Sequence, residues 1–244
     1  MFWVAAKLAP GCGNSMKSEV EASVTEFDFS RLLHFWDTRA PDILGLVVEH
    51  ISVVAVSLLI AMIVGVGIGM VVWDRPIPRA IVIAAAGVAL TIPSLAMLAL
   101  LIPAFGLGWA PTIIALVMYS LLPIVRNTVV GLREVPPAVM ESAKGMGMNQ
   151  LSVLLKVQLP IAWPIILTGV RVAAQLTIGI AAIAAYVAGP GLGTYIFQGL
   201  SSLGSVNALN FALTGTLGVV LLALLVDALF VAITSYSTSR GLRA

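Results

Sequence analysis

Residues 46–72 read LVVEHISVVAVSLLIAMIVGVGIGMVV, and Glu49 carries the only formal charge among them. A helix of this length is about 40 Å long at 1.5 Å per residue, enough to cross the roughly 30 Å hydrocarbon core of a bilayer. Gly65, Gly67 and Gly69 lie in its second half. Small residues let helices approach closely in lipid, where association depends on packing. The stretch therefore predicts a membrane-spanning helix.

Further spanning helices are predicted along the rest of the chain, at residues 80–102, 111–130, 161–188 and 211–233. The whole chain is 60% hydrophobic and only 10% charged, whereas a soluble domain carries roughly 25% charged residues. Pro93 and Pro123 fall within spans, where neighbouring helices can satisfy the freed carbonyls. Gly169 and Gly215, like Gly65 and Gly69, suit close helix packing. We expect an all-α membrane protein with about five transmembrane helices.

Composition also argues against several classes of function. The net charge is +2, and no basic run interleaved with aromatic residues is present, so we expect no nucleic-acid partner. Cys12 is the single cysteine and His34 and His50 are the only histidines, so no cysteine metal site or His-Glu-x-x-His motif is possible. We expect no catalytic residue, no metal and no cofactor in this chain.

The distribution of Lys and Arg predicts the orientation in the membrane, because these residues gather on the cytoplasmic side. Residues 103–110 and 189–210 carry no charge, whereas the alternate connections and the C-terminal segment are basic, with Arg75, Arg79, Arg126, Arg133, Lys144, Lys156, Arg240 and Arg243. We predict an extracytoplasmic N-terminal tail, residues 1–45, and a transmembrane domain, residues 46–244, with its C-terminus inside.

The N-terminal tail contains one short amphipathic pattern. Phe29, Leu32, Leu33 and Trp36 recur at helical spacing. A helix of this kind either lies in the outer interface of the membrane or packs on the transmembrane bundle. The sequence leaves both alternatives open.

The longest cytoplasmic connection, residues 132–159, has the pattern of two short helices rather than of a simple linker. Pro136-Pro137 ends the preceding helix and suits the first turn of a new one. Good helix formers follow at residues 138–144, a turn at residues 145–147, and a second helical run at residues 150–156. Ala143 and Gly147 would share a small face if the first helix extended that far. This projection predicts a docking site for another protein.

The same loop resembles the "EAA" loop of binding-protein-dependent ABC importer permeases. That family pattern is Glu-Ala-Ala, three residues, Gly, nine residues, Ile, one residue and Leu-Pro. The chain departs from it with Ser142 for the first Ala and Val157 for Ile. It keeps the other positions in register, with Glu141, Ala143, Gly147, Leu159 and Pro160.

Other stretches resemble the osmoprotectant branch of that family, which imports glycine betaine, carnitine or choline. They are residues 91–96, 121–128, 141–148 and 189–193, and the resemblance covers the chain from about Asp42 onward. It implies the type I ABC importer permease fold and a place in the bacterial cytoplasmic (inner) membrane. Related branches import methionine, proline or sulfonates, so a permease for such amino acids is the alternative.

The resemblance also implies partners. A pair of ABC ATPase subunits, which bind ATP and Mg, would receive the coupling loop, and an extracytoplasmic solute-binding protein would deliver the solute. A second permease, either an identical copy or a paralogue, would complete the path. Within the loop, Gly147 would turn the chain, and Glu141 would hold the loop in shape or meet a basic group. The permease itself would carry out no chemistry.

Two ionisable residues are predicted to lie inside the membrane. Arg171 follows Pro160 by 11 residues, about 16 Å along a helix, and Asp227 precedes Arg240 by 13 residues, about 20 Å. Charges at such depth usually face a partner or water. One hypothesis is that Arg171 and Asp227 pair and join the fourth and fifth spans, and the alternative is direct contact with the solute. Gln175, one turn beyond Arg171, either lines a path or bonds to a neighbouring helix.

The polar residues of the first span add little to the prediction of function. Glu49 and His50 fall at the outer end of the first span, where we expect them in the headgroup region without a function.

An ion-coupled secondary transporter would show inverted repeats, and five spans divide poorly into two halves. Composition alone does not separate a permease from a simple channel.

Overall fold

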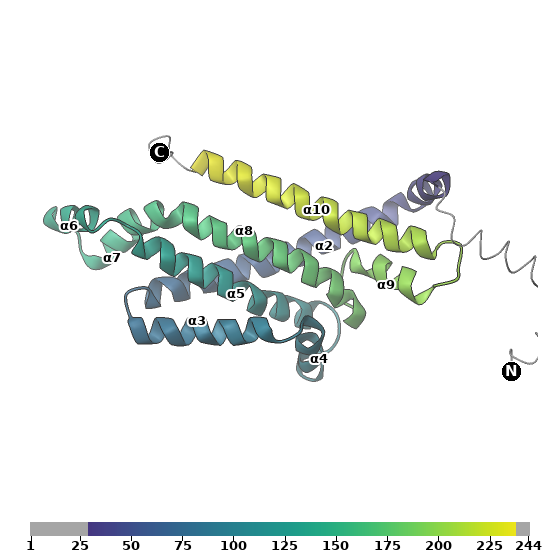
Figure 1. The fold of residues 1–244 in the computed structure, drawn as a ribbon, viewed down its shortest axis with the longest axis horizontal. Helices are drawn as coiled ribbons and strands as arrows, with labels where there is room; N and C mark the ends of the chain where they lie inside the picture. Colours follow the sequence, from purple (N-terminus) through teal and green to yellow (C-terminus); the bar gives the residue numbers. More distant parts are fainter. Residues whose placement is uncertain (1–28, 238–244) are drawn as a thin grey trace, which may run out of the picture.

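The computed structural model describes residues 29–237, with side chains through residue 235, so most of the predicted tail and the last residues lie outside the described part. All regular elements in this range are helical, which confirms the predicted all-α class. The helices run along the molecule in one bundle (Figure 1). They are α2 (Phe29–Val72), α3 (Pro76–Thr91), α4 (Ser94–Phe105), α5 (Trp109–Arg133), α6 (Pro137–Gly145), α7 (Gln150–Val153), α8 (Leu159–Ala184), α9 (Gly193–Ser201) and α10 (Ala208–Ser237).

Helix α2 contains a short N-terminal helix and the first span, joined at a kink. Arg39 has the non-helical angles φ −115° and ψ 15°, and Pro41 follows inside the helix. Proline lacks an N–H and its ring clashes with the preceding turn, which accounts for the kink. The predicted domain boundary at residue 45 stays a prediction.

The short helix before the kink packs on the bundle through its aromatic residues. Phe35 is buried, and the centroid of its ring lies 4.9 Å from that of Phe211 and 6.2 Å from that of Tyr195. Trp36 donates a hydrogen bond from Nε1 to the Thr214 hydroxyl at 2.8 Å. These contacts fit the second of the two alternatives, a helix packed on the bundle.

The bundle is centred on α5, which packs between α2 and α8. Glycines bring these helices into close contact. A Cβ at Gly65 would lie 2.8 Å from Cγ2 of Ile124, and one at Gly69 would lie 2.6 Å from Cγ2 of Thr128. Both values are shorter than a normal van der Waals contact, so neither position has room for a side chain. The predicted close packing is confirmed here and at the two other positions, Gly169 and Gly215.

The second span is not the continuous helix that the sequence predicts. Helices α3 and α4 meet at an angle of 97°. The reason is Pro93: a residue before proline is disfavoured in the α region, and Ile92 has φ −69° and ψ 128°. The break frees the Ile92 carbonyl, and Tyr119 of α5 donates its hydroxyl to that oxygen at 2.6 Å. A neighbouring helix thus satisfies the freed carbonyl, as lipid requires.

The fourth span begins earlier than predicted. Helix continues from Gln150 through α8, with a π-helical turn at residues 154–158, so the second short helix of the loop is not separated from the span. In this turn Leu159 donates its N–H to the Leu154 carbonyl, five residues back. Pro160 lies directly after this turn, where the helical hydrogen bonds are already displaced by one residue, so its missing N–H is accommodated. Leu159-Pro160 therefore does not interrupt the helix.

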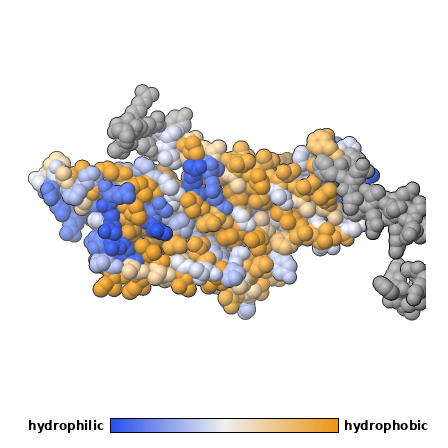
Figure 2. Space-filling view, in the orientation of Figure 1, coloured by the Kyte–Doolittle hydropathy of each residue, from blue (hydrophilic) through white to orange (hydrophobic). Residues whose placement is uncertain are grey.

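The surface of the bundle has the character expected of a membrane protein. Four helices of the described part are long and apolar enough to cross a membrane, and the bent pair of α3 and α4 would make a fifth. Exposed apolar side chains cover much of the length of the bundle, while hydrophilic residues gather at the end that carries α6 and α7 (Figure 2). The estimate of about five spans agrees with this arrangement.

Replacing Gly69 by Ala is expected to destabilise the bundle, because the added methyl would overlap Thr128. Overpacking of this kind costs about 1–3 kcal/mol. Gly67 on the same helix is the matched control, since a Cβ there meets nothing within 4 Å. Thermal unfolding of the purified protein in detergent should show a lower midpoint for G69A and an unchanged or higher one for G67A. Equal midpoints would contradict the close α2–α5 contact.

Replacing Tyr119 by Phe should also lower stability, because the Ile92 carbonyl would lose its donor. An unsatisfied buried polar group costs about 1–3 kcal/mol. Tyr186, whose side chain is 68% exposed, provides the control variant Y186F. Denaturant unfolding in micelles should separate the two variants, and a Y119F protein as stable as Y186F would show that the bond at the break is dispensable.

Candidate functional site

The loop that joins α5 to α8 projects beyond the bundle at one end (Figure 1). The same end contains the turn from α2 to α3 and the last residues of α10. Five basic side chains belong to this end, namely Arg75, Arg79, Arg133, Lys144 and Lys156, whereas Arg31 and Arg39 lie in the N-terminal helix at the other end. The polar composition of this end distinguishes it from the apolar length of the bundle.

The local sequence explains why the projection is a helix, a tight turn and a second helix. Pro136 and Pro137 begin α6, since proline is preorganised for the first turn. Beyond the end of α6, Gly147 has φ +81° and donates its N–H to the Lys144 carbonyl at 2.9 Å. The Asn149 side chain then accepts the Ser152 N–H at 2.8 Å and caps α7. Gly147 thus turns the chain between the two helices.

The predicted loop residues do not all face outward. Glu141, Ser142 and Gly147 are exposed, whereas Ala143 is only 2% exposed and packs within the chain. The condition for a small face shared by Ala143 and Gly147 is not met, because α6 ends at Gly145 and Gly147 lies in the turn.

The base of the projection is held by buried contacts. Gln158 in the π-helical turn is 2% exposed, and its amide lies 3.2 Å from the sulfur of Met140 on α6. Leu159 is half-buried against the core that α2, α5 and α8 form, and Pro160 is exposed. These contacts attach α6 to the helix that continues into α8.

The tip of the projection exposes apolar side chains at the polar end of the molecule. Met146 is 75% exposed and Leu151 63% exposed, with Val139 nearby in sequence on α6. A hollow of about 490 Å³ separates the loop from the end of α2, and Trp73, Arg75 and Lys144 are among the residues that line it. Apolar side chains in a polar region, next to a hollow, are typical of a protein docking surface.

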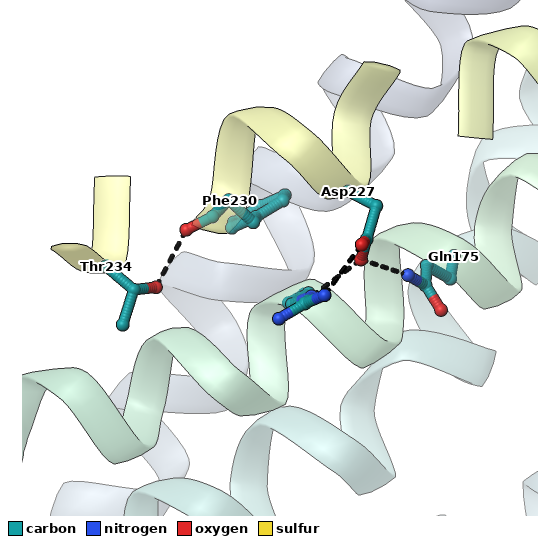
Figure 3. Close-up of polar contacts among 5 residues, drawn as sticks. Gln175, Asp227, Phe230 and Thr234 are labelled. Carbon is teal, nitrogen blue, oxygen red and sulfur yellow. Dashed lines mark hydrogen bonds and ion pairs between the residues drawn. The ribbon is translucent and has the colours of Figure 1, made fainter. Parts of the chain in front are cut away.

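The structure brings Arg171 and Asp227 together between α8 and α10. The Nε and Nη2 atoms of Arg171 each lie 2.6 Å from a carboxylate oxygen of Asp227, which is a bidentate ion pair. Gln175 points toward Asp227 from one turn further along α8 and also donates to its carboxylate (Figure 3). The side chains of Arg171 and Asp227 remain 38% and 28% exposed, on an otherwise largely apolar part of the surface.

At the opposite end of the bundle, His50 occupies a site that the sequence did not indicate. It is completely buried among the helices, and its Nε2–H donates to the Ile178 carbonyl at 3.2 Å; its expected headgroup depth stays a prediction. Its Nδ1 has no partner. Gly191, at φ +112°, lies against the ring, so closely that a Cβ there would be 2.7 Å from Nδ1. The glycines of residues 189–193 were the available signal for this contact.

The described residues contain no group of three His, Cys, Asp or Glu side chains that could hold a metal ion. Two features of this part of the chain are candidates for a functional role. They are the projecting loop and the polar cluster of Arg171, Asp227 and Gln175.

Comparison with known proteins identifies the family of this architecture. The model of the family described as "Binding-protein-dependent transport system inner membrane component" matches residues 57–235. The choline transport system permease protein OpuBB of Bacillus subtilis is 35% identical over 80% of this chain and 88% of its own length. The osmoprotectant import permease protein OsmW of Salmonella typhimurium is 35% identical over 86% and 99%.

A further relative and a solved structure extend the comparison. The glycine betaine/carnitine/choline transport system permease protein OpuCD of Bacillus subtilis is 38% identical over 73% of this chain and 77% of its own. A chain from an inward-facing structure of the MetNI methionine ABC transporter superposes with a TM-score of 0.70, covering 80% of this chain and 96% of that one. Its identity is 22%, so this likeness concerns the fold alone.

Replacing Gly147 by Ala should strain the turn of the loop, since a side chain in the left-handed region costs roughly 1–2 kcal/mol. A Cβ there meets nothing within 4 Å, so strain is the sole effect. Gly145 has equal space and no positive φ, which makes G145A the matched control. Hydrogen exchange of the amides in residues 144–149 should accelerate in G147A and remain unchanged or slow down in G145A. The same exchange in both variants would contradict the assigned turn.

Proposed function

Because the chain belongs to the family of binding-protein-dependent transport system inner membrane components, we propose that it forms the membrane path of an ATP-driven importer for a small osmoprotectant. Members of this family are translocation components, not enzymes, and this chain is an inner-membrane component with several spanning helices. The solute class proposed is that of glycine betaine, choline and carnitine.

The coupling function rests on the projecting loop. Its turn at Gly147, its exposed apolar tip and its continuous helix into α8 form a rigid lever at the basic end of the bundle. A pair of ATPase subunits would bind this loop, and they would hold the ATP and Mg. Closure of the ATPase pair would then displace α7 and, with it, α8, and so change which side of the membrane the path opens to. Glu141 either supports the shape of the loop or pairs with a basic group of the ATPase.

The choice of solute is supported by the relatives. These relatives are named for choline, carnitine, glycine betaine or osmoprotectants, and they are 33–38% identical over most of this chain. A permease for an amino acid such as methionine or proline is the second candidate. The superposed methionine transporter adds no weight to it, since 22% identity supports only a common fold. Family membership disfavours an ion-coupled secondary transporter.

The remaining partners follow from the family and the charge distribution. An extracytoplasmic solute-binding protein would dock at the end that carries α4 and α9, opposite the coupling loop. A second permease, identical or paralogous, would face this one across the path. The basic residues at the end that bears the loop support a cytoplasmic position for that end, with the N-terminus outside and the C-terminus inside.

Uptake of labelled glycine betaine would test the proposal directly. The chain is produced with its ATPase and binding protein in a bacterial host without osmolyte uptake, and E141A, G147A and the control G145A are compared. We expect energised uptake by the unchanged importer and by G145A, with a fall of about tenfold or more in G147A, since a misdirected loop uncouples the ATPase.

The outcomes separate the two parts of the proposal. Loss of uptake in G147A with normal amounts in the membrane would support the coupling role, and uptake equal to that of G145A would refute it. An assembled importer that moves no betaine, choline or carnitine would remove the solute class. Failure to copurify with any ATPase would overturn the proposal as a whole.

A further inference from the structure

We propose that Arg171, Asp227 and Gln175 form a transient binding site for zwitterionic solutes within the translocation path. This inference deepens the proposed function and rests on it. It concerns the solute-binding residues of this chain, which neither the loop nor the family membership identifies.

The position of the ion pair is the first argument. Arg171 lies 12 residues after the start of α8, about 18 Å along the helix, and so near the middle of the span. A charged residue at the centre of a spanning helix costs about 2.5–3.5 kcal/mol on insertion scales. Yet both side chains of the pair keep more than a quarter of their surface exposed. This surface therefore faces water or protein rather than lipid.

The pattern of exposure along α8 supports the same assignment. Twelve of the 26 residues of this helix are buried, and its exposed positions beyond the first turn are Thr168, Val172, Gln175, Leu176 and Gly179. They recur every three or four residues and so form one stripe, with Arg171 beside it. Val172 and Leu176 in this stripe are apolar and the Thr168 hydroxyl donates to the Pro164 carbonyl, so its polar character rests on the Gln175 amide and the adjoining Arg171. In Figure 2 a hydrophilic patch interrupts the apolar surface between the two ends of the bundle.

Helix α10 provides the contrast. Its exposed residues are mostly large and apolar, as lipid contact requires: Leu217, Val220, Leu221, Leu224, Leu225 and Leu229. Asp227 is the one acidic residue of this helix, and it faces α8 (Figure 3). The carboxylate is thus directed to the polar stripe and away from the apolar surface.

The chemistry of the cluster matches the two ends of a betaine. A guanidinium binds a carboxylate through two parallel hydrogen bonds, as Arg171 does with Asp227. The carboxylate of a betaine can replace that of Asp227 on Arg171, which frees Asp227 to attract the quaternary ammonium. Gln175 donates to either carboxylate. After the solute leaves, the two side chains pair again, so no unpaired charge remains in the membrane.

Exchange with an existing ion pair also explains why such a site would be transient. Each solute must displace the bidentate contact between Arg171 and Asp227. Binding therefore gains only the difference between the new contacts of the solute and the ion pair that is lost. Weak binding suits a path, which has to release its solute. Choline has the ammonium but no carboxylate, so it would depend on Asp227 and not on Arg171.

Selectivity between the two kinds of solute provides the test. The complete importer carrying R171Q is compared with the unchanged one for uptake of labelled glycine betaine and labelled choline, with copurification of the ATPase as the measure of assembly. We expect the ratio of betaine to choline uptake to fall about tenfold, the value of one charge-assisted contact. D227N should reduce the uptake of both solutes. An unchanged ratio in R171Q would overturn the inference and leave the pair a purely structural one.

The charge-exchange variant, R171D with D227R, covers the case in which R171Q does not assemble. It keeps an ion pair between α8 and α10 but reverses its direction. We expect assembly and thermal stability near those of the unchanged importer, with betaine uptake still reduced about tenfold. Full recovery of uptake would overturn the inference. If the unchanged importer moves none of the three osmolytes, the solute proposal fails, and this inference fails with it.

Discussion

The need to satisfy every backbone polar group without water is the constraint on which this structure depends. It explains why the described part of the chain is helical, and it is most visible where a helix is interrupted. At Pro93 the freed Ile92 carbonyl receives the Tyr119 hydroxyl. Near Pro160 the chain adopts a π-helical turn and stays helical. The first interruption redirects a helix, whereas the second lets a helix of the projecting loop run directly into a span.

Packing in this bundle depends on small residues more than on large ones. Gly65 and Gly69 place α2 against α5, and Gly169 places α8 against the other side of α5. An apolar side chain is as favourably surrounded by lipid as by a neighbouring helix. The helices are therefore held together by such close contacts and by hydrogen bonds. The central position of α5 follows from them. It leaves α10 at the surface, attached to the bundle by α8, α9 and the ion pair.

The two candidate functional regions are linked by one helix. The projecting loop is fixed at its base by Gln158 and Met140, and the helix that starts at Gln150 continues to Arg171 and beyond. A movement imposed on the loop by a partner therefore reaches the polar stripe of α8 without crossing a hinge. Under the proposed function, this link would carry the closure of an ATPase pair to the path in the membrane.

The sequence by itself determined the features that depend on local composition: the helical class, about five spans, the close-packing glycines, the basic end and the turn at Gly147. Hydropathy and propensity are read along the chain, so they are available without a fold. The tertiary structure alone decided the inward position of Ala143, the burial of His50 beneath Gly191 and the bidentate geometry of Arg171 with Asp227. Each of these depends on which residues of another segment lie beside it. The local sequence of a segment does not specify its distance from a segment far away in the chain.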